Sequence, residues 1–229
     1  MRRVVPLLII VGVLAVSVLG AWYLKRSAAS SELTTDQRQG RKSSPAKQKL
    51  GATPAHERGP SSAPVMLEEF ADFECHACGV IYPIMKQVEQ EFGSQIVVVF
   101  REYPLAMHKN GMTAAQAAEA AGLQNKFWEM HDVLFQNQKE WHQVADVRPL
   151  YRGYASQVGI DVEKFERDMA SDEVAKRIAA DRERGGWVGI ESTPTVFLNG
   201  REVPFETLTA ADKFKELVRA ELNSPEKKN

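Results

Sequence analysis

The sequence predicts an α/β domain in which helices flank a central mixed sheet and a helical subdomain is inserted between the two halves of that sheet. Three observations lead to this prediction. Residues 65–100 have the pattern strand, helix, strand, which is typical of a parallel pair joined by a right-handed crossover. A helical block follows, from about residue 105 to 186. Strand patterns then return at residues 195–203, around the turn dipeptide Asn199-Gly200.

The first half of the sheet is predicted from two apolar runs with a helix between them. Residues 65–70 indicate a short strand, and the helix after it continues to about Phe92. We expect Pro83 to kink this helix, because proline has no N–H and its ring clashes with the preceding turn. Residues 95–100 are β-branched and nearly all apolar, as in a strand that is buried on both faces.

The inserted block and the end of the chain are predicted to be mainly helical. The block shows four helical stretches, at residues 112–138, 147–158, 162–170 and 172–184. Asp161 is the predicted N-cap of the third stretch, because a short acidic side chain can accept from the free N–H groups of a first turn. After the hairpin, a last helix is predicted at about 210–222, with Thr209 and Asp212 at its cap.

The N-terminus predicts a membrane anchor at residues 1–26. Arg2 and Arg3 precede an apolar run from residue 4 to about 24 without a charge, and a helix of about twenty residues matches the roughly 30 Å of the hydrocarbon core. The two arginines favour a cytoplasmic N-terminus, which places the rest of the chain outside the cytoplasm. The alternative is a cleaved signal peptide with its site near residues 18–20.

The remaining boundaries follow from composition. Residues 27–62 are rich in small and polar residues, which predicts a flexible linker that cannot bury enough apolar surface to fold. The folded domain is predicted at residues 63–223, and a polar tail at 224–229. The net charge is −1, and no basic stripe alternates with aromatic residues, so nucleic acid is not an expected partner.

The only two cysteines of the chain, Cys75 and Cys78, lie between the first predicted strand and its helix. A CxxC pair at such a junction is typical of thiol–disulfide exchange. Cys75 is the predicted nucleophile, because the N–H groups and the dipole of a helix N-terminus favour its thiolate. Cys78 lies about one turn deeper and is the predicted resolving thiol. His76 between them could stabilise the thiolate further, or it could be a solvent-facing loop residue.

The sequence allows three other interpretations of the cysteine pair. It could be half of a zinc site, although there is no second cysteine pair and the other histidines show no ligand spacing. It could be a structural disulfide, although so small a loop would contribute little stability. Finally, Cys75, Cys78 and His76 could bind a soft metal such as Cu(I) in a protein that is not an enzyme.

Four features together resemble one known family. They are the CxxC after a strand, Pro83 five residues beyond Cys78, the helical insert, and the segment Thr193-Pro194-Thr195. With these features, residues 65–203 resemble the thioredoxin superfamily, and within it the DsbA-like branch of exported disulfide oxidoreductases. That branch more often has its histidine next to the second cysteine, so the position of His76 departs from the pattern.

The resemblance implies roles for three further residues. Pro194 would follow a cis peptide bond, and the backbone of Thr193 would then face outward, where it could pair with an extended substrate. Glu69 would be a buried acid that passes a proton to or from Cys78 through water, with a pKa raised by burial. The alternatives are an ordinary loop proline with a trans bond, and a surface carboxylate at the end of the strand, with Glu68 on the opposite face.

The sequence therefore predicts a membrane-tethered thiol–disulfide oxidoreductase with its catalytic domain in the periplasm or cell-envelope space. Its expected substrates are exported proteins that contain cysteine, and the expected direction is disulfide formation. No cofactor is needed, because the dithiol is itself the redox group. The resemblance implies a membrane redox partner that recycles the pair, of the quinone-linked kind. The alternative is a reductase or isomerase that serves a narrow set of exported targets.

Overall fold

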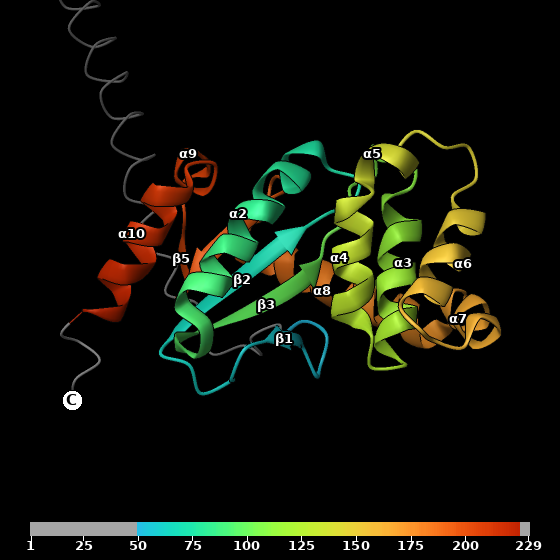
Figure 1. Ribbon diagram of the computed structural model, residues 1–229, viewed down its shortest axis with the longest axis horizontal. Helices are drawn as coiled ribbons and strands as arrows, with labels where there is room; N and C mark the ends of the chain where they lie inside the picture. Colours follow the sequence, from blue (N-terminus) through green and yellow to red (C-terminus); the bar gives the residue numbers. More distant parts are fainter. Residues whose placement is uncertain (1–49, 225–229) are drawn as a thin grey trace, which may run out of the picture. The chain divides into compact units, whose positions relative to one another are not determined.

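The computed structural model describes residues 50–224, and these contain a five-stranded mixed sheet with the order β1-β3-β2-β4-β5 (Figure 1). The neighbours β2 and β3 are parallel, and the other three pairs are antiparallel. The strands are β1 (His56–Arg58), β2 (Val65–Ala71), β3 (Ile96–Glu102), β4 (Thr195–Leu198) and β5 (Arg201–Glu202). The predicted α/β fold with a mixed sheet is confirmed.

The centre of the sheet is formed by β2 and β3, which helix α2 (His76–Phe92) connects. All seven residues of β3 are buried, as its β-branched sequence predicts for a strand covered on both faces. Pro83 lies inside α2, and the helix continues past it to Phe92. One apolar core fills the space between the sheet and the two helices α2 and α10 (Ala211–Leu222). Packing in this core places the N-terminus of α2 beside the end of β2.

The insert between β3 and β4 consists of helices, as predicted. They are α3 (Gly111–Gly122), α4 (Phe127–Gln136), α5 (Gln138–Trp141), α6 (Arg148–Gln157), α7 (Val162–Met169) and α8 (Asp172–Val188). The single stretch predicted at 112–138 is divided into α3 and α4, because the chain turns at Asn125, where φ is +61°. Helix α5 begins at the last residue of that stretch. The predicted N-cap of α7 is confirmed, since Asp161 Oδ1 accepts from the Lys164 N–H at 2.8 Å.

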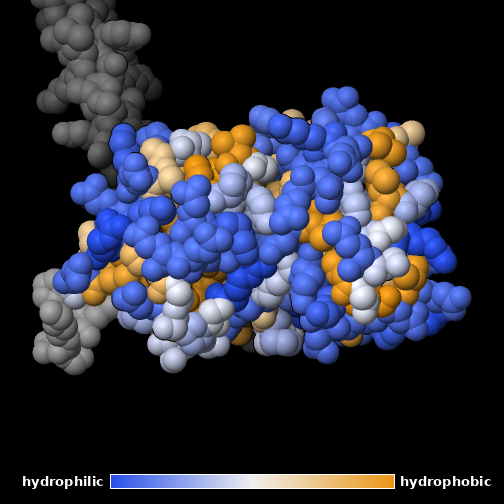
Figure 2. Space-filling model, viewed as in Figure 1, coloured by the Kyte–Doolittle hydropathy of each residue, from blue (hydrophilic) through white to orange (hydrophobic). Residues whose placement is uncertain are grey.

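The alanine-rich helix α3 lies inside a second apolar core. Six of its alanines are buried, and the larger side chains around them include Trp141, Tyr151 and Phe165. Small side chains allow α4, α7 and α8 to approach α3 closely (Figure 1). On the face drawn in Figure 2, hydrophilic side chains predominate and separate the apolar areas from one another. The insert is therefore a packed subdomain that can hold residues at the active site in place.

The predicted cap of the last helix is wrong. The N-cap of α10 is Ala210, and no side chain accepts from the first turn. A short helix that the sequence analysis did not predict, α9 (Phe205–Leu208), precedes it. Thr209 belongs to the end of α9, where its hydroxyl donates to the carbonyl of Phe205 at 3.3 Å. The Thr209 side chain is thus occupied one turn before α10 begins.

The predicted start of the domain at residue 63 is also wrong. Strand β1 lies within the predicted linker and pairs with β3, and Ala52 is buried. The segment is polar, and it is held by backbone hydrogen bonds and by contacts to buried charges, which composition does not reveal. The predicted anchor, the first part of the linker and most of the tail lie outside the described residues. Within residues 50–224, none of the helices has the length and apolar character needed to cross a membrane.

Candidate active site

The two cysteines lie where β2 passes into α2. Cys75 is the N-cap residue of α2, and its N–H donates to the Asp72 carbonyl at 3.0 Å. Asp72 strengthens this turn, because its Oδ1 accepts from the Glu74 N–H at 2.8 Å. Both cysteines are free thiols; Cys75 is 8% exposed and Cys78 is fully buried. The outer sulfur is thus the one that a partner protein can reach.

The surroundings of Cys75 favour its thiolate. The pKa of this thiol is lowered to about 5, chiefly because the Cys78 thiol can donate a hydrogen bond to the thiolate. Burial opposes this effect, whereas the Thr193 side chain and the N–H groups of Cys78 and Ala77 lower the pKa further. The Cys75 thiol donates to the Thr193 carbonyl at 3.3 Å. The Thr193 hydroxyl is buried without a hydrogen-bond partner, so it is available as a donor once the sulfur is ionised.

Cys78 has the opposite character. Burial raises the pKa of its thiol well above the ordinary value, and the neighbouring Cys75 and the charge of Glu69 act in the same direction. The N–H of Asp72 opposes these effects. Cys78 therefore keeps its proton while Cys75 loses it. This asymmetry corresponds to the predicted roles of nucleophile and resolving thiol.

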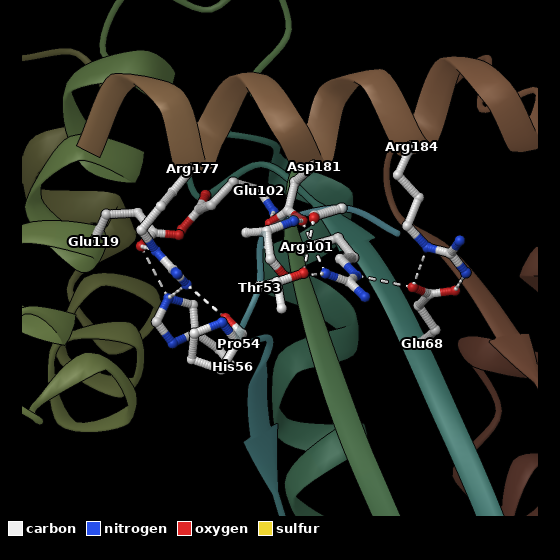
Figure 3. Close-up of polar contacts among 12 residues, drawn as sticks. Thr53, Pro54, His56, Glu68, Arg101, Glu102, Glu119, Arg177, Asp181 and Arg184 are labelled. Carbon is white, nitrogen blue, oxygen red and sulfur yellow. Dashed lines mark hydrogen bonds and ion pairs between the residues drawn. The ribbon is translucent and has the colours of Figure 1, made fainter. Parts of the chain in front are cut away.

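Glu69 on β2 is 4% exposed, which excludes the alternative that it is a surface carboxylate. Its pKa is raised to about 8, first by burial and then by the charge of Glu89, while Arg58 opposes the shift. At neutral pH it is thus mainly protonated. Glu68, which alternation along the strand placed on the opposite face, is buried as well and forms ion pairs with Arg101 and Arg184 (Figure 3). Both neighbours are buried because both faces of the central strand are covered.

Glu69→Gln is expected to remove a pH dependence of stability. In the wild-type protein, the folded carboxyl keeps its proton between pH 4.5 and about 8, where the unfolded one has lost it. The wild-type free energy of unfolding should therefore fall as pH rises through this window, by up to about 5 kcal/mol. Glutamine does not ionise, so the variant should gain stability relative to wild type toward pH 8. Urea unfolding of both proteins at pH 5, 6.5 and 8 measures the two free energies of unfolding. A difference between them that does not change with pH would contradict this prediction.

The Thr193–Pro194 peptide bond is cis, as the family resemblance implied. Proline 194 lies directly before β4, the neighbour of β2 in the sheet. Beside it is a groove of about 310 Å³, whose lining includes Ala77 of α2, Val203 and Phe205. The Thr193 carbonyl faces Cys75, so the pairing of the Thr193 backbone with a substrate stays a prediction.

The structure gives His76 no visible part in tuning the thiolate. Its side chain is exposed at the first residue of α2, and the groups that lower the pKa of Cys75 most belong to other residues. His76 thus lies where the alternative of a solvent-facing residue places it. Within residues 50–224, no three His, Cys, Asp or Glu side chains are grouped so that they could hold a metal ion.

Sequence reasoning missed the side chains that fix the loop before Cys75. Asp72 Oδ2 accepts from the Leu105 N–H and lies 2.7 Å from His108 Nδ1. Gln138 Nε2 donates to the carbonyls of Phe73, at 2.7 Å, and Cys75, at 2.8 Å. No local pattern marks these contacts, because the two residues of each pair are more than thirty positions apart in the sequence.

A family model described as thioredoxin matches residues 52–220. Among curated proteins, the chain is 40% identical over 148 residues to the Na(+)/H(+) antiporter NhaA 1 of Salinispora arenicola, which is 64% of this chain and 22% of that one. The NhaA antiporter of Herminiimonas arsenicoxydans is 36% identical over 148 residues, with 65% and 23% covered. The chain thus spans about a fifth of the length of these relatives.

Solved structures share the fold at lower sequence identity. Oxidised BdbD from Bacillus subtilis aligns with a TM-score of 0.66 at 24% identity, over 74% of this chain and 94% of that one. The thiol-disulfide exchange protein alpha-DsbA2 from Wolbachia pipientis aligns with 0.60 at 20%, over 72% and 87%. The thiol-disulfide oxidoreductase MdbA from Actinomyces oris aligns with 0.58 at 20%, over 69% and 80%. The predicted resemblance to this group of folds is confirmed.

Proposed function

The chain belongs to the thioredoxin family, and on that premise we propose that it is a dithiol–disulfide oxidoreductase with Cys75 and Cys78 as its redox centre. The observation that carries the proposal is the contrast between the two thiols. One thiol at a helix N-terminus has a pKa lowered to about 5, and its buried neighbour has a raised pKa. Such a pair has one sulfur that reacts with a partner and a second that completes the exchange.

The proposed exchange runs in the direction of disulfide formation. A substrate thiolate attacks the Cys75 sulfur of the Cys75–Cys78 disulfide, the bond between the two cysteines breaks, and Cys78 leaves as a thiolate. Because its pKa is raised, Cys78 takes up a proton, for which protonated Glu69 is the proposed source, directly or through water. A second substrate thiolate then attacks the substrate sulfur of the mixed disulfide and releases the Cys75 thiolate. The substrate loses two electrons and the pair gains them.

The stabilised thiolate supports disulfide formation as the direction of exchange. A low pKa of Cys75 stabilises the reduced pair relative to its disulfide, so the disulfide becomes the stronger oxidant. The groove that Thr193 and Pro194 line is the proposed place for an extended substrate segment, and the Thr193 carbonyl faces Cys75. A reductase or isomerase would use the same residues at a lower potential and is the alternative.

The cellular setting is proposed from the N-terminal sequence. The uncharged run at residues 4–24 supports a membrane tether, with the domain in the periplasm or cell-envelope space. Disulfide formation suits such an oxidising compartment, where the substrates would be exported proteins that contain cysteine. A membrane redox partner would reoxidise the pair. Transport, which the names of the curated relatives state, is not part of the proposed function, because the match covers only about a fifth of their length.

The reduction potential of the full chain tests the proposal. The protein is equilibrated in glutathione buffers, and the free thiols are counted by alkylation. We expect a value much nearer to the roughly −120 mV of DsbA than to the roughly −270 mV of thioredoxin. A value near that of thioredoxin would contradict disulfide formation and leave the exchange centre in place. If the number of free thiols does not change by two between reducing and oxidising buffers, Cys75 and Cys78 do not act as a redox pair, and the whole proposal fails.

A further inference from the structure

We propose that Gln138 of the helical insert is a positioning residue for the Cys75 thiolate. It holds the two carbonyls on either side of the turn into α2, and so keeps the N–H groups of the first helical turn directed at the sulfur. The inference rests on the proposed function, since it takes Cys75 to be the nucleophile. Through these carbonyls, a residue of the insert influences the reactivity of a sulfur that lies outside the insert.

The contact is specific in its chemistry. Gln138 is the first residue of α5 and is 7% exposed. Its Nε2 carries two hydrogens and reaches two acceptors, the carbonyl oxygens of Phe73 and Cys75, at 2.7 and 2.8 Å. The opposite orientation of the amide would place its oxygen against both carbonyls and would be repulsive. Two acceptors therefore determine which way the amide points.

The two carbonyls control the geometry around the sulfur. The Cys75 carbonyl also accepts the Gly79 N–H at 3.1 Å, which is the first hydrogen bond along α2. The Phe73 carbonyl lies inside the turn that Asp72 begins. The N–H groups of Ala77 and Cys78, which help to stabilise the thiolate, belong to this first turn. Without the amide, the Phe73 carbonyl would lose its buried donor, and the turn would shift to find another partner.

Gly79 of α2 lies against the Gln138 amide and has no side chain that would collide with it. A Cβ atom added at position 79 would lie 2.3 Å from Gln138 Oε1 and 2.9 Å from its Cδ. Glycine at this position therefore leaves the space that the amide occupies. Gly79→Ala should displace the amide without changing Gln138 itself, which provides a second and independent way to break the contact.

The backbone of Gln138 is held in place by contacts within the insert. The Gln138 carbonyl accepts the His142 N–H at 3.0 Å, and the Trp141 indole N–H donates to the Leu134 carbonyl at 2.9 Å. Trp141 is fully buried in the core of the insert. The position of Gln138 is therefore set by the packing of the insert, and the position of the turn before Cys75 depends on it.

The experiment measures the thiolate titration of Cys75, by ultraviolet absorbance of the reduced full chain, and the reduction potential. The variants are Gln138→Ala, Gln138→Met, Gly79→Ala and the double variant Gly79→Ala with Gln138→Ala. Each single variant should raise the titration midpoint by roughly one pH unit, a tenfold loss of thiolate at low pH. The potential should fall by about 30 mV for each tenfold change in the exchange equilibrium. In the Gln138→Ala background, Gly79→Ala should add nothing, because the colliding amide is gone.

Controls separate positioning from folding. Gln138→Met keeps the length of the side chain and removes only the donors, so it must give the same shift as Gln138→Ala. Gln136→Ala is the matched control, since Gln136 is exposed and its amide contacts the Tyr82 hydroxyl. It should leave the midpoint unchanged. Cooperative urea unfolding of each variant confirms that the measured protein is folded. If the Gln138 variants do not fold, Gly79→Ala still tests the contact.

The outcomes distinguish this inference from the proposed function. A wild-type midpoint near the ordinary cysteine value would contradict the activated nucleophile and so the proposed function. A low wild-type midpoint that Gln138→Met and Gly79→Ala leave unchanged would overturn only the role of Gln138. Equal effects of Gly79→Ala with and without Gln138 would also overturn it, because the two positions would then act independently.

Discussion

Cys75→Ser is expected to abolish thiol–disulfide exchange, with a loss on the order of 10³-fold or more relative to wild type. A serine hydroxyl stays protonated at neutral pH and cannot form a mixed disulfide. Reduction of insulin and oxidation of a reduced protein substrate measure the two directions. The loss should be the same in both, because each direction passes through a bond to the Cys75 sulfur.

Cys78→Ser is the matched variant and should behave differently. Cys75 keeps its helix N-terminus and can still attack a substrate disulfide, which releases the other substrate sulfur as a thiolate. No neighbouring thiol is then present to resolve the mixed disulfide. The mixed disulfide should therefore accumulate and be visible by mass spectrometry under non-reducing conditions. A trapped complex in Cys75→Ser, and none in Cys78→Ser, would reverse the assigned roles.

Arg101→Ala is expected to destabilise the domain by about 3–5 kcal/mol. Arg101 is 7% exposed, and its guanidinium donates to Glu68 at 2.8 Å and to Asp181 at 3.0 Å (Figure 3). Asp181 lies close to Glu102, whose carboxyl is fully buried without a hydrogen-bond partner. Removal of the cation would leave the buried Asp181 without its ion pair, whereas Glu68 would keep Arg184. It would also free the N-terminal segment, because Arg101 donates to the Ala52 carbonyl at 3.2 Å.

The pH dependence of this loss has a definite sign. Burial already raises the pKa of Asp181, while the charge of Arg101 lowers it. Without Arg101 the folded-state pKa rises further, so the variant loses stability as pH rises through that value. The deficit of Arg101→Ala against wild type should thus be larger at pH 7.5 than at pH 5 in urea unfolding.

The exposed ion pair between Arg152 and Glu166 provides the control for Arg101. Both side chains are about half exposed, so Arg152→Ala should leave the free energy of unfolding almost unchanged. A loss of similar size for Arg101→Ala and Arg152→Ala, or a deficit for Arg101→Ala that does not change with pH, would contradict the account of the buried charges.

The parts of this protein that the sequence determined are those that depend on near neighbours. The buried run at 95–100 predicted β3, and Asn199-Gly200 predicted the hairpin between β4 and β5. The position of Cys75 at the start of a helix predicted which thiol is activated, because helix-end N–H groups act within one turn. The cis bond before Pro194 came from the family resemblance, since local preference alone favours trans.

The tertiary structure alone decided what depends on distant segments. Alternation along the strand placed Glu68 on the face opposite Glu69 but did not show what covers either face, and in the structure both residues are buried. Composition assigned residues 52–62 to a linker, but backbone pairing with β3 and the buried Arg101 hold that segment in the domain. Gln138 reaches the Cys75 carbonyl from 63 positions away. The reason is the same in each case. Burial and long-range contacts arise when separate segments pack together, and the sequence around a residue does not show which distant segment will cover it.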